Sequence, residues 1–254
     1  MDTAPHKTKE TLAAMYDVYT DAEIAKICRC STGAVRWWRR KLGIATKPWR
    51  RRKSALPIDQ DFFSDINTEA KAYFLGFLTA DGYVSKSGRT VSCCVSAGDV
   101  HILEDLRDAA GSGARITDKK VAGYPGSKPQ KVIVLSSKKL VGDLAIHGVV
   151  PNKTHTIRYA DVTPELERHY IRGIVDGDGY IGKQQFAVVG TSALLDGITA
   201  AVRRHTGCAL VSSPMRGCPR IVGSRRDRDA LRWLYDGAVH VLSRKHQNFV
   251  EFWQ

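Results

Sequence analysis

The chain contains one kind of stretch twice: FLGFLTADGYV at residues 74–84 and IRGIVDGDGYI at residues 171–181. Each copy is typical of an apolar helix that stops at Asp-Gly and leads into a strand. Both copies carry small residues four positions apart, namely Gly76 with Ala80 and Gly173 with Gly177. Residues at i and i+4 share one helix face, so the two helices can cross with their backbones nearly touching.

This crossing would bring Asp81 and Asp178 together. A carboxylate at a helix C-terminus faces the negative end of the helix dipole, which is unfavourable by roughly 0.3–1 kcal/mol. Two such acids side by side favour a bound cation. The alternative for one copy alone is an ordinary helix stop, with a left-handed glycine after the last turn. Repetition of the surrounding chain argues against that alternative.

The order of expected elements repeats around the two stretches. Each half is expected to contain helix, hairpin, helix, hairpin and helix, and then a lysine, Lys153 or Lys245. The expected helices are 68–80, 100–110 and 137–147 in the first half, and 163–176, 194–205 and 229–235 in the second. The expected strands are 83–84, 90–95, 114–117 and 131–135, then 180–181, 186–189, 209–212 and 220–222. Repetition of this order indicates two copies of one structural unit.

These features resemble the paired motifs of LAGLIDADG homing endonucleases in their single-chain, two-motif form. The resemblance covers about residues 60 to 254. In that family the eighth motif position supplies the metal-binding acid, which falls here on Asp81 and Asp178. The sixth position is often acidic as well; Asp176 keeps this feature and Thr79 departs from it.

The resemblance also implies a basic residue in each active site, which matches Lys153 and Lys245. Such a residue polarises water or stabilises developing charge. The alternative for either lysine is a surface charge. Ser96 and Thr191 fall near the family's polar, water-organising position.

Phosphodiester hydrolysis needs an attacking water, charge neutralisation at phosphorus and help for the leaving oxygen. Divalent metals held by carboxylates can supply all three. Mg²⁺ prefers a few carboxylates together with waters and substrate phosphates, a requirement that Asp81 and Asp178 suit. We therefore expect Mg²⁺ as the cofactor, with Mn²⁺ and other divalent cations as alternatives.

The formal net charge of the 254-residue chain is +13, and residues 1–53 carry +8 of it. This asymmetry favours a polyanionic partner, most simply double-stranded DNA. No apolar run approaches the roughly 18–20 residues of a membrane span, so we expect no membrane association. Six cysteines without a Cys-x-x-Cys pair are expected to be reduced. These features predict a cytoplasmic protein that associates with the nucleoid through DNA.

The first 46 residues resemble a helix-turn-helix DNA-binding unit. Thr20 and Glu23 form a capping box, and Ser31 can cap the next helix. Ile24, Ile27, Val35 and Leu42 are the expected core. The second helix carries basic residues at Arg36, Arg39, Arg40 and Lys41. A plain helical hairpin with a solvated basic face is the alternative.

Two further groups of residues are candidates for contact with DNA. Residues 47–60 are expected to form a basic linker that follows DNA phosphates. The alternative is a solvated tether without contact to DNA. The basic cluster of the linker is Arg50, Arg51, Arg52 and Lys53. The two hairpins of each half would build one curved antiparallel sheet that faces a major groove. Candidate side chains on the sheets are Lys86, Arg89, Lys131, Lys183, Gln185 and Arg216.

The sequence thus predicts an α+β protein. Two pseudo-symmetric αββαββα repeats, residues 61–160 and 161–254, would form a DNA-binding saddle after the small all-α domain. The family resemblance implies a monomer that acts as a pseudo-dimer, a mobile genetic element, and cleavage of a long DNA site. A non-catalytic DNA-binding regulator or an intron RNA maturase on the same scaffold is the alternative. The C-terminal Phe-Trp-Gln lacks the His-Asn end of an intein, which disfavours that context.

Overall fold

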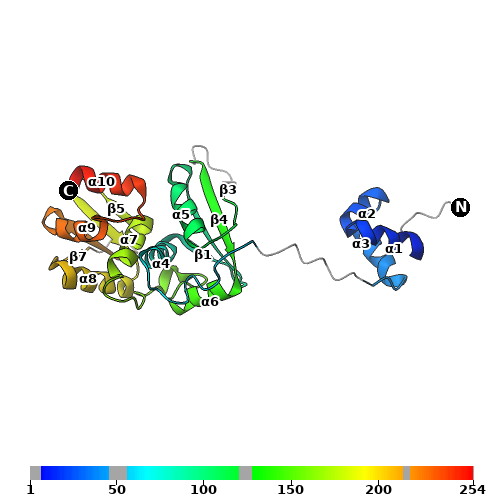
Figure 1. Ribbon diagram of the computed structural model, residues 1–254, viewed down its shortest axis with the longest axis horizontal. Coiled ribbons are helices and arrows are strands. Elements are labelled where there is room, and N and C mark those ends of the chain that lie inside the picture. The colour runs from blue at the N-terminus through cyan, green and yellow to red at the C-terminus, as the bar shows by residue number, and fades with distance from the viewer. Residues whose placement is uncertain (1–6, 46–55, 120–127, 214–217, 254) are drawn as a thin grey trace. The chain divides into compact units, whose positions relative to one another are not determined.

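The computed structural model describes residues 7–45, 56–119, 128–213 and 218–253. The chain divides into two compact units, Met1–Ala55 and Leu56–Gln254 (Figure 1). Each unit has its own hydrophobic core. We call them unit 1 and unit 2 and describe each by itself.

Between residues 7 and 45, unit 1 contains the α-helices α1 (Lys9–Val18), α2 (Asp21–Ile27) and α3 (Thr32–Lys41). The expected caps are present: Thr20 and Glu23 form the capping box of α2, and the Ser31 hydroxyl accepts the Ala34 N–H at the start of α3. The buried core consists of Leu12, Ile24, Ala25 and Val35, with Leu42 partly buried against it. The expectation for Ile27 was wrong, because this side chain lies at the end of α2 and is 52% exposed.

Unit 2 contains the two repeats. The first consists of α4 (Glu69–Asp81), β1 (Gly82–Val84), β2 (Thr90–Ser96), α5 (His101–Ala109), β3 (Thr117–Lys119), β4 (Gln130–Ser136) and α6 (Lys138–Ile146). The second consists of α7 (Glu167–Asp178), β5 (Gly179–Ile181), β6 (Gln185–Val189), α8 (Ser192–Thr206), β7 (Val211–Ser212), β8 (Arg220–Ser224), α9 (Arg228–Tyr235) and α10 (Ser243–Trp253). The two αββαββα repeats that the sequence predicts are therefore present.

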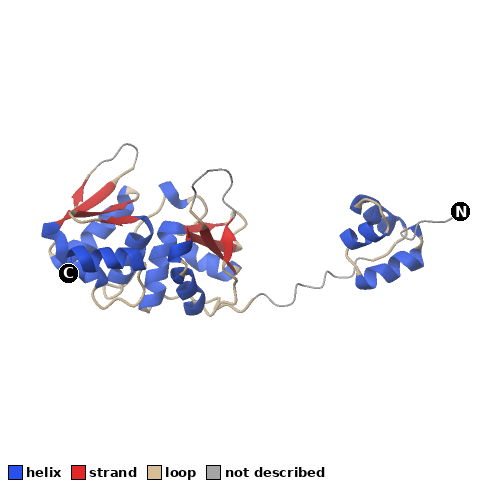
Figure 2. Cartoon of the chain, turned by 90° about the horizontal axis from the view of Figure 1, so that it is seen from above, coloured by secondary structure: helices blue, strands red, loops and turns tan. Residues whose placement is uncertain are grey.

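Each repeat builds one four-stranded antiparallel sheet. The strand orders are β1-β2-β4-β3 and β5-β6-β8-β7, so the two sheets have matching topology. Figure 2 shows the strands of unit 2 in two separate groups. Alternate residues of β2 are buried against helices, as expected for a sheet with one covered face. The α+β fold class is confirmed.

Helices α4 and α7 lie side by side at the centre of unit 2, with one repeat on each side (Figure 1). A Cβ atom added to Gly76 would lie 1.9 Å from the carbonyl oxygen of Tyr170. A Cβ atom added to Gly173 would lie 2.1 Å from the carbonyl oxygen of Tyr73. The backbones therefore touch where the small residues predicted the crossing.

The glycines after the two aspartates are not left-handed helix stops. Gly82 has φ −72° and ψ 135°, and Gly179 has φ −89° and ψ 167°, so both are extended. Glycine is required at these two positions by the lack of room for a side chain and not by the backbone dihedral angles. A Cβ atom at either position would lie 2.4 Å from a carbonyl oxygen of the preceding turn, that of Leu78 or Val175. The chain can thus pass directly from helix to strand.

Several boundaries differ from the expectations. Helix α7 begins at Glu167, because residues 163–166 form a preceding turn. Strand β3 begins at Thr117 rather than at 114. Residues 56–60, expected in the linker, belong to unit 2, where Asp59 N–H bonds the Ala110 carbonyl. Helix α10 was not predicted.

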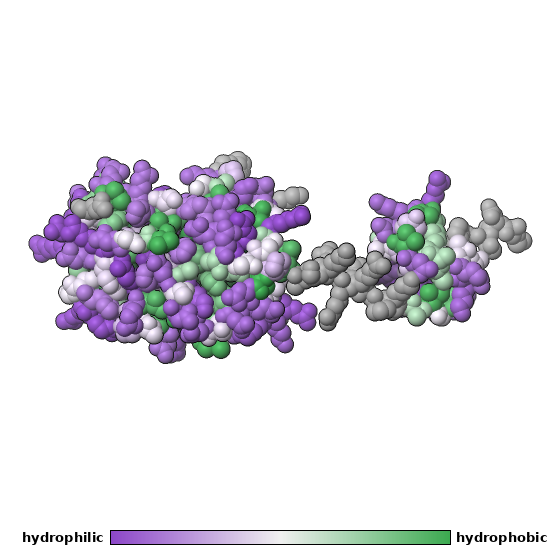
Figure 3. Space-filling view, in the orientation of Figure 1, coloured by the Kyte–Doolittle hydropathy of each residue, from purple (hydrophilic) through white to green (hydrophobic). Residues whose placement is uncertain are grey.

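The described helices include none that is long and apolar enough to cross a membrane. On the face shown in Figure 3, hydrophilic residues predominate over unit 2 and apolar ones form small patches. The large apolar side chains instead fill the core around α4 and α7.

Candidate active site and nucleic-acid interface

Asp81 is the last residue of α4, and Asp178 is the last residue of α7. The crossing of the helices brings these ends together: a Cβ atom on Gly177 would lie 3.4 Å from Oδ2 of Asp81 and 2.3 Å from Cβ of Ala80. Both aspartates remain exposed to solvent, although protein surrounds them on several sides. The predicted pairing of the two acids is therefore present.

Neither carboxylate has a hydrogen-bond or ion-pair partner among the residues that the structure describes. Burial, followed by the nearby charge of Asp178, raises the pKa of Asp81 to about 6. Burial also raises the pKa of Asp178. Ionised carboxylates without partners at two negative helix ends are unfavourable until a positive group binds them.

The two lysines expected in the active site are buried rather than on the surface. Lys153 follows α6 in a 3₁₀ turn, η3 (Lys153–His155), and is 9% exposed; Lys245 lies in α10 and is 3% exposed. Lys153 Nζ donates to the carbonyl oxygens of Ala80 (3.2 Å) and Gly82 (2.7 Å). These bonds cap the end of α4, because its last carbonyl groups have no partner within the helix.

Lys245 caps the end of α7 in the same way. Its Nζ donates to the carbonyl oxygens of Val175 (2.7 Å), Asp176 (2.7 Å) and Gly177 (3.1 Å). Burial lowers the pKa of Lys245 to about 8, and burial also lowers the pKa of Lys153. The alternative that these lysines are surface charges is wrong.

The four charged groups form one electrostatic cluster. Among the lysines, Lys245 opposes the raised pKa of Asp81 more strongly than Lys153 does. For Asp178 the order is reversed, and Lys153 acts more strongly. Both lysines thus stabilise both carboxylates, although each lysine caps the helix of its own repeat.

The donor set at this position fits a hard divalent cation. No group of three or more His, Cys, Asp or Glu side chains that could hold a metal occurs in the described part of the chain. Within the described residues, Asp81 and Asp178 thus offer two carboxylates, and a cation there would take its further ligands from backbone, water or substrate oxygens. Mg²⁺ prefers this type of site to a complete cage of protein ligands.

Asp176, at the sixth position of the second motif, is a buried structural residue. It accepts hydrogen bonds from the hydroxyl groups of Tyr73 (2.7 Å) and Tyr235 (2.6 Å) and from the Leu242 N–H (2.7 Å). Burial raises the pKa of Asp176, and these hydrogen bonds act in the opposite direction by lowering it. The corresponding Thr79 donates its hydroxyl to the carbonyl oxygen of Leu75 (2.8 Å). The non-acidic residue at this motif position therefore forms its hydrogen bond within its own helix.

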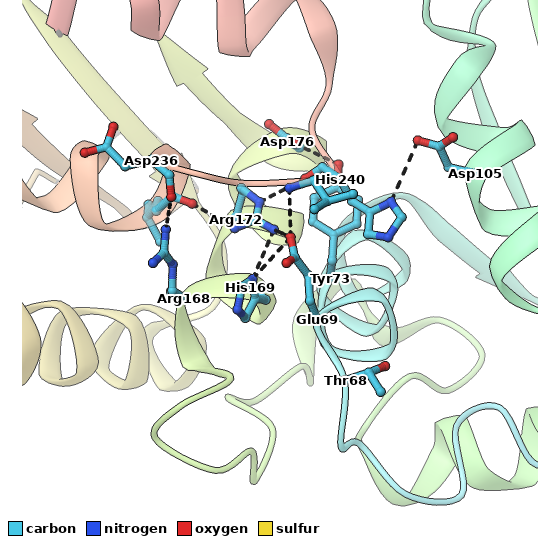
Figure 4. A network of polar contacts seen from close by, with 12 residues as sticks. Thr68, Glu69, Tyr73, Asp105, Arg168, His169, Arg172, Asp176, Asp236 and His240 are labelled. Carbon is cyan, nitrogen blue, oxygen red and sulfur yellow. Dashed lines mark hydrogen bonds and ion pairs between the residues drawn. The ribbon is translucent and has the colours of Figure 1, made fainter.

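Arg172 connects the two motif helices and was missed by sequence reasoning. Its fully buried guanidinium donates to Glu69 Oε1 on α4 (2.5 Å), to the Leu234 carbonyl (2.8 Å) and to the His240 carbonyl (2.9 Å) (Figure 4). It also donates to His169 Nδ1 (3.1 Å); burial and then the charge of Arg172 lower the pKa of His169 to about 4. An arginine inside an otherwise apolar motif helix is the signal that could have indicated this network.

Thr191 is a structural residue in this protein. Its hydroxyl accepts the Leu194 N–H at the start of α8 and donates to the Ile157 carbonyl. Ser96 is the last residue of β2 and pairs across the sheet with Gln130.

The predicted sheet residues do not all lie on one surface. Lys86 and Arg89 are exposed beside the β1–β2 turn, and Lys183 and Gln185 are exposed beside the β5–β6 turn. Lys131 pairs in register with Val95, which is buried, so its side chain lies on the helix-covered side of the sheet. There it forms an ion pair with Asp118 (2.7 Å). Arg216 lies outside the described residues.

The basic residues of α3 have different environments. Arg36 and Arg39 both bind Asp21, at 2.9 and 3.2 Å, and the Arg39 side chain is only 16% exposed. Lys41 Nζ lies over the rings of Trp37 and Trp38. Arg40 is exposed and is the clearest candidate for phosphate contact. The basic cluster at residues 50–53 lies outside the described residues.

No family model matches the sequence, and no curated protein is significantly similar to it. Among solved structures, the homing endonuclease I-WcaI bound to its DNA recognition sequence aligns with a TM-score of 0.52 and 12% identity, over 82% of this chain and 97% of that one. Unit 2 has the LAGLIDADG fold.

I-DmoI in complex with DNA and Ca aligns with a TM-score of 0.50 and 15% identity, over 76% of this chain and 99% of that one. Full-length DUF199/WhiA from Thermotoga maritima aligns more weakly, with a TM-score of 0.49 and 13% identity over 76% of this chain. This chain spans 64% of that protein, which is less than two thirds. Identities this low establish the LAGLIDADG fold and not the activity.

Proposed function

We propose that this protein is a site-specific, metal-dependent DNA endonuclease of the homing type that cuts both strands. The observation that carries the proposal is the pair of unpartnered carboxylates, Asp81 and Asp178, at the ends of two crossing helices. Two structures with the same fold, I-WcaI and I-DmoI, are homing endonucleases determined with DNA. Their activity supports, by analogy of fold, a nuclease role for this pair.

Asp81 and Asp178 would hold Mg²⁺, with Mn²⁺ as an alternative. Such an ion, when bound, supplies charge neutralisation at the phosphate and a more acidic water. Lys153 and Lys245 hold the ends of α4 and α7 in place and add positive charge beside the carboxylates. Because the crossing brings the two helix ends together and both lysines act on both acids, each catalytic centre would combine residues from both repeats.

The partner would be double-stranded DNA, bound by one chain acting as a pseudo-dimer. The two sheets present Lys86, Arg89, Lys183 and Gln185 at exposed positions beside their hairpin turns. Unit 1 would add affinity as a helix-turn-helix module, with Arg40 and the basic cluster at residues 50–53 at phosphates. Function in a mobile genetic element, with the protein associated with cellular DNA, fits this role.

The experiment is to incubate the purified chain with a randomised double-stranded DNA library in Mg²⁺ and to sequence the cut ends. The proposal predicts a long, nearly asymmetric site cut on both strands, and no cutting in EDTA. A protein that selects a site by binding but never cuts it would instead be a DNA-binding regulator. Selection of structured RNA in place of DNA would favour the maturase alternative.

A further inference from the structure

Arg244 is a charged residue beside the candidate active site to which no role has been given so far. It directly precedes Lys245, whose ammonium group caps the end of α7. The Arg244 side chain is 59% exposed, whereas Lys245 is buried. Burial is the main cause of the raised pKa of Asp81, and the positive charge of Arg244, after those of both lysines, opposes it. Arg244 is therefore both open to solvent and close to the paired carboxylates.

The first repeat holds Arg244 in place. Asp99, in the 3₁₀ turn η2 (Ala97–Asp99), accepts a hydrogen bond from Arg244 Nε at 3.1 Å. The neighbouring Ser243 hydroxyl and N–H lie 3.0 and 3.3 Å from Nε2 of His101, the first residue of α5. A charged residue of the second repeat is thus fixed by side chains of the first.

The contact with Asp99 leaves most of the guanidinium unused. An arginine has five N–H donors, and Nε–H is the one that Asp99 accepts. Among the described residues, no acceptor bonds the N–H groups on Nη1 and Nη2 of Arg244. These groups form a planar fork that matches two oxygens of a phosphate. Arg244 also does not stabilise α10, because a cation in the first turn faces the positive end of the helix dipole.

The first repeat has no arginine at the corresponding place. The residue before Lys153 is Asn152, which is uncharged and has a left-handed backbone with φ 58°. Lys153 and Lys245 themselves act alike, since each caps the motif helix of its own repeat. The surroundings of the two lysines therefore differ by one exposed positive charge, that of Arg244.

We propose that Arg244 is a further catalytic residue, whose Nη groups bind the scissile phosphate beside Asp81, so that the strand with this phosphate is cut faster than the other. The inference rests on the proposed endonuclease function. In the hydrolysis, water adds to phosphorus, the bond to the leaving sugar oxygen breaks, and that oxygen takes up the proton that the water releases. Negative charge grows on the phosphate oxygens, and a guanidinium held there stabilises it. The other scissile phosphate has no such partner, because Asn152 stands at that place.

The test is single-turnover cleavage, in Mg²⁺, of a duplex that carries the selected site and a different label on each strand. The full wild-type chain should cut one strand faster than the other. We expect Arg244→Met to slow that strand by at least about tenfold, the low end for hydrogen bonds to charged groups, and to leave the other strand near its wild-type rate. Arg244→Lys keeps the charge without the planar fork and should have an intermediate rate.

Two controls separate this role from a general loss of charge or of structure. Arg203→Met removes an exposed arginine on α8 and should change neither rate. Asp99→Asn removes the ion pair but keeps the guanidinium, and its amide oxygen can still accept from Arg244 Nε. It should therefore keep the difference between the strands, which Arg244→Met loses. Melting temperatures check that each variant is folded.

Three results would overturn this inference and leave the proposed function intact. They are equal rates for the two strands in the wild type, equal slowing of both strands by Arg244→Met, and equal effects of Arg244→Met and Asp99→Asn. The last result would mean that Arg244 only joins the two repeats. A wild-type chain that cuts neither strand would overturn both this inference and the proposed function.

Discussion

Asp81 shows why the candidate site needs a positive partner. Its carboxylate has no hydrogen bond within the described residues and lies near a second carboxylate at the crossing of α4 and α7. A carboxyl group whose pKa is higher in the folded state than in the unfolded state destabilises the fold once it ionises. This follows because the unfolded chain releases the proton at a lower pH. For Asp81 the cost develops between about pH 4 and pH 6 and is complete above pH 6.

We therefore expect Asp81→Asn to raise the melting temperature of the metal-free protein at pH 8. The difference from wild type should shrink as pH falls from 6 to 4, since Asp81 is then protonated. Added Mg²⁺ should stabilise the wild-type protein more than the variant, which keeps only one of the two carboxylates, because a ligand stabilises the state that binds it. Thermal denaturation with and without Mg²⁺ measures both effects. An equal response of the two proteins to Mg²⁺ would remove Asp81 from the metal site.

Lys245 combines a structural and an electrostatic role in one side chain. We expect Lys245→Met to lower the free energy of unfolding by about 2 kcal/mol or more, because it leaves three buried carbonyl oxygens without their donor. Lys153→Met should cost less, since Lys153 bonds two carbonyl groups. Both variants should also cut at least about 10²-fold more slowly in a single turnover.

The measurements for the lysines are chemical denaturation and single-turnover cleavage with protein well above its dissociation constant. Lys138→Met is the control, because Lys138 is exposed on α6 and should change neither quantity. Wild-type cleavage rates for both Lys153→Met and Lys245→Met would show that the lysines only support the helices.

At the scale of elements, the crossing of α4 and α7 depends on glycine. We expect Gly173→Ala to destabilise unit 2 by about 3 kcal/mol, since the new methyl group would meet backbone atoms of α4 that cannot rotate away. Gly142→Ala on α6 is the matched control: it is an exposed helical glycine with nothing within 4 Å of the added Cβ. It should stabilise the protein by about 0.5–1 kcal/mol. Equal effects of the two changes in denaturant titrations would refute close contact at the crossing.

The element order could be predicted because it repeats, and the small residues indicated where the helices touch. Arg172 within an apolar helix could have indicated a buried polar network, but its partners could not be predicted, because they come from α4, from α9 and from the chain after α9. Helix α10 was missed because Ser243-Arg244-Lys245 matches the turn that carries Lys153 in the first repeat. The apolar residues Phe249 and Trp253, buried at helical spacing, were the signal for it.

At the scale of the whole molecule, the positive charge is divided between two units. Residues 1–53 carry +8 of the net +13. We expect a chain that begins at Ser54 to bind its DNA site more weakly. The slope of log affinity against log salt should fall by about 0.9 for each lost phosphate contact, so by about 2 or more in total. Binding titrations at several salt concentrations measure this slope. An unchanged slope would reject a DNA role for unit 1.

The shortened chain should still cut DNA at low salt, because both carboxylates and both lysines belong to unit 2. Burial of Lys153 and Lys245 could not be read from the sequence, in which each lysine merely follows the last expected helix of its repeat. It results from the return of the chain to the motif helices, where the ammonium groups meet the final carbonyl oxygens. The whole fold is thus needed to assemble the four charged groups.

The most direct test of the proposed active site is cleavage of a supercoiled plasmid that carries the selected site, with the wild-type chain, Asp81→Asn and Asp178→Asn in Mg²⁺. The site geometry predicts that the wild-type protein makes linear DNA. Each variant should bind the site within about tenfold of wild type and make no linear product, although a single variant can nick one strand. Linear product at the wild-type rate from either variant would contradict the assignment of the paired carboxylates as the catalytic centre.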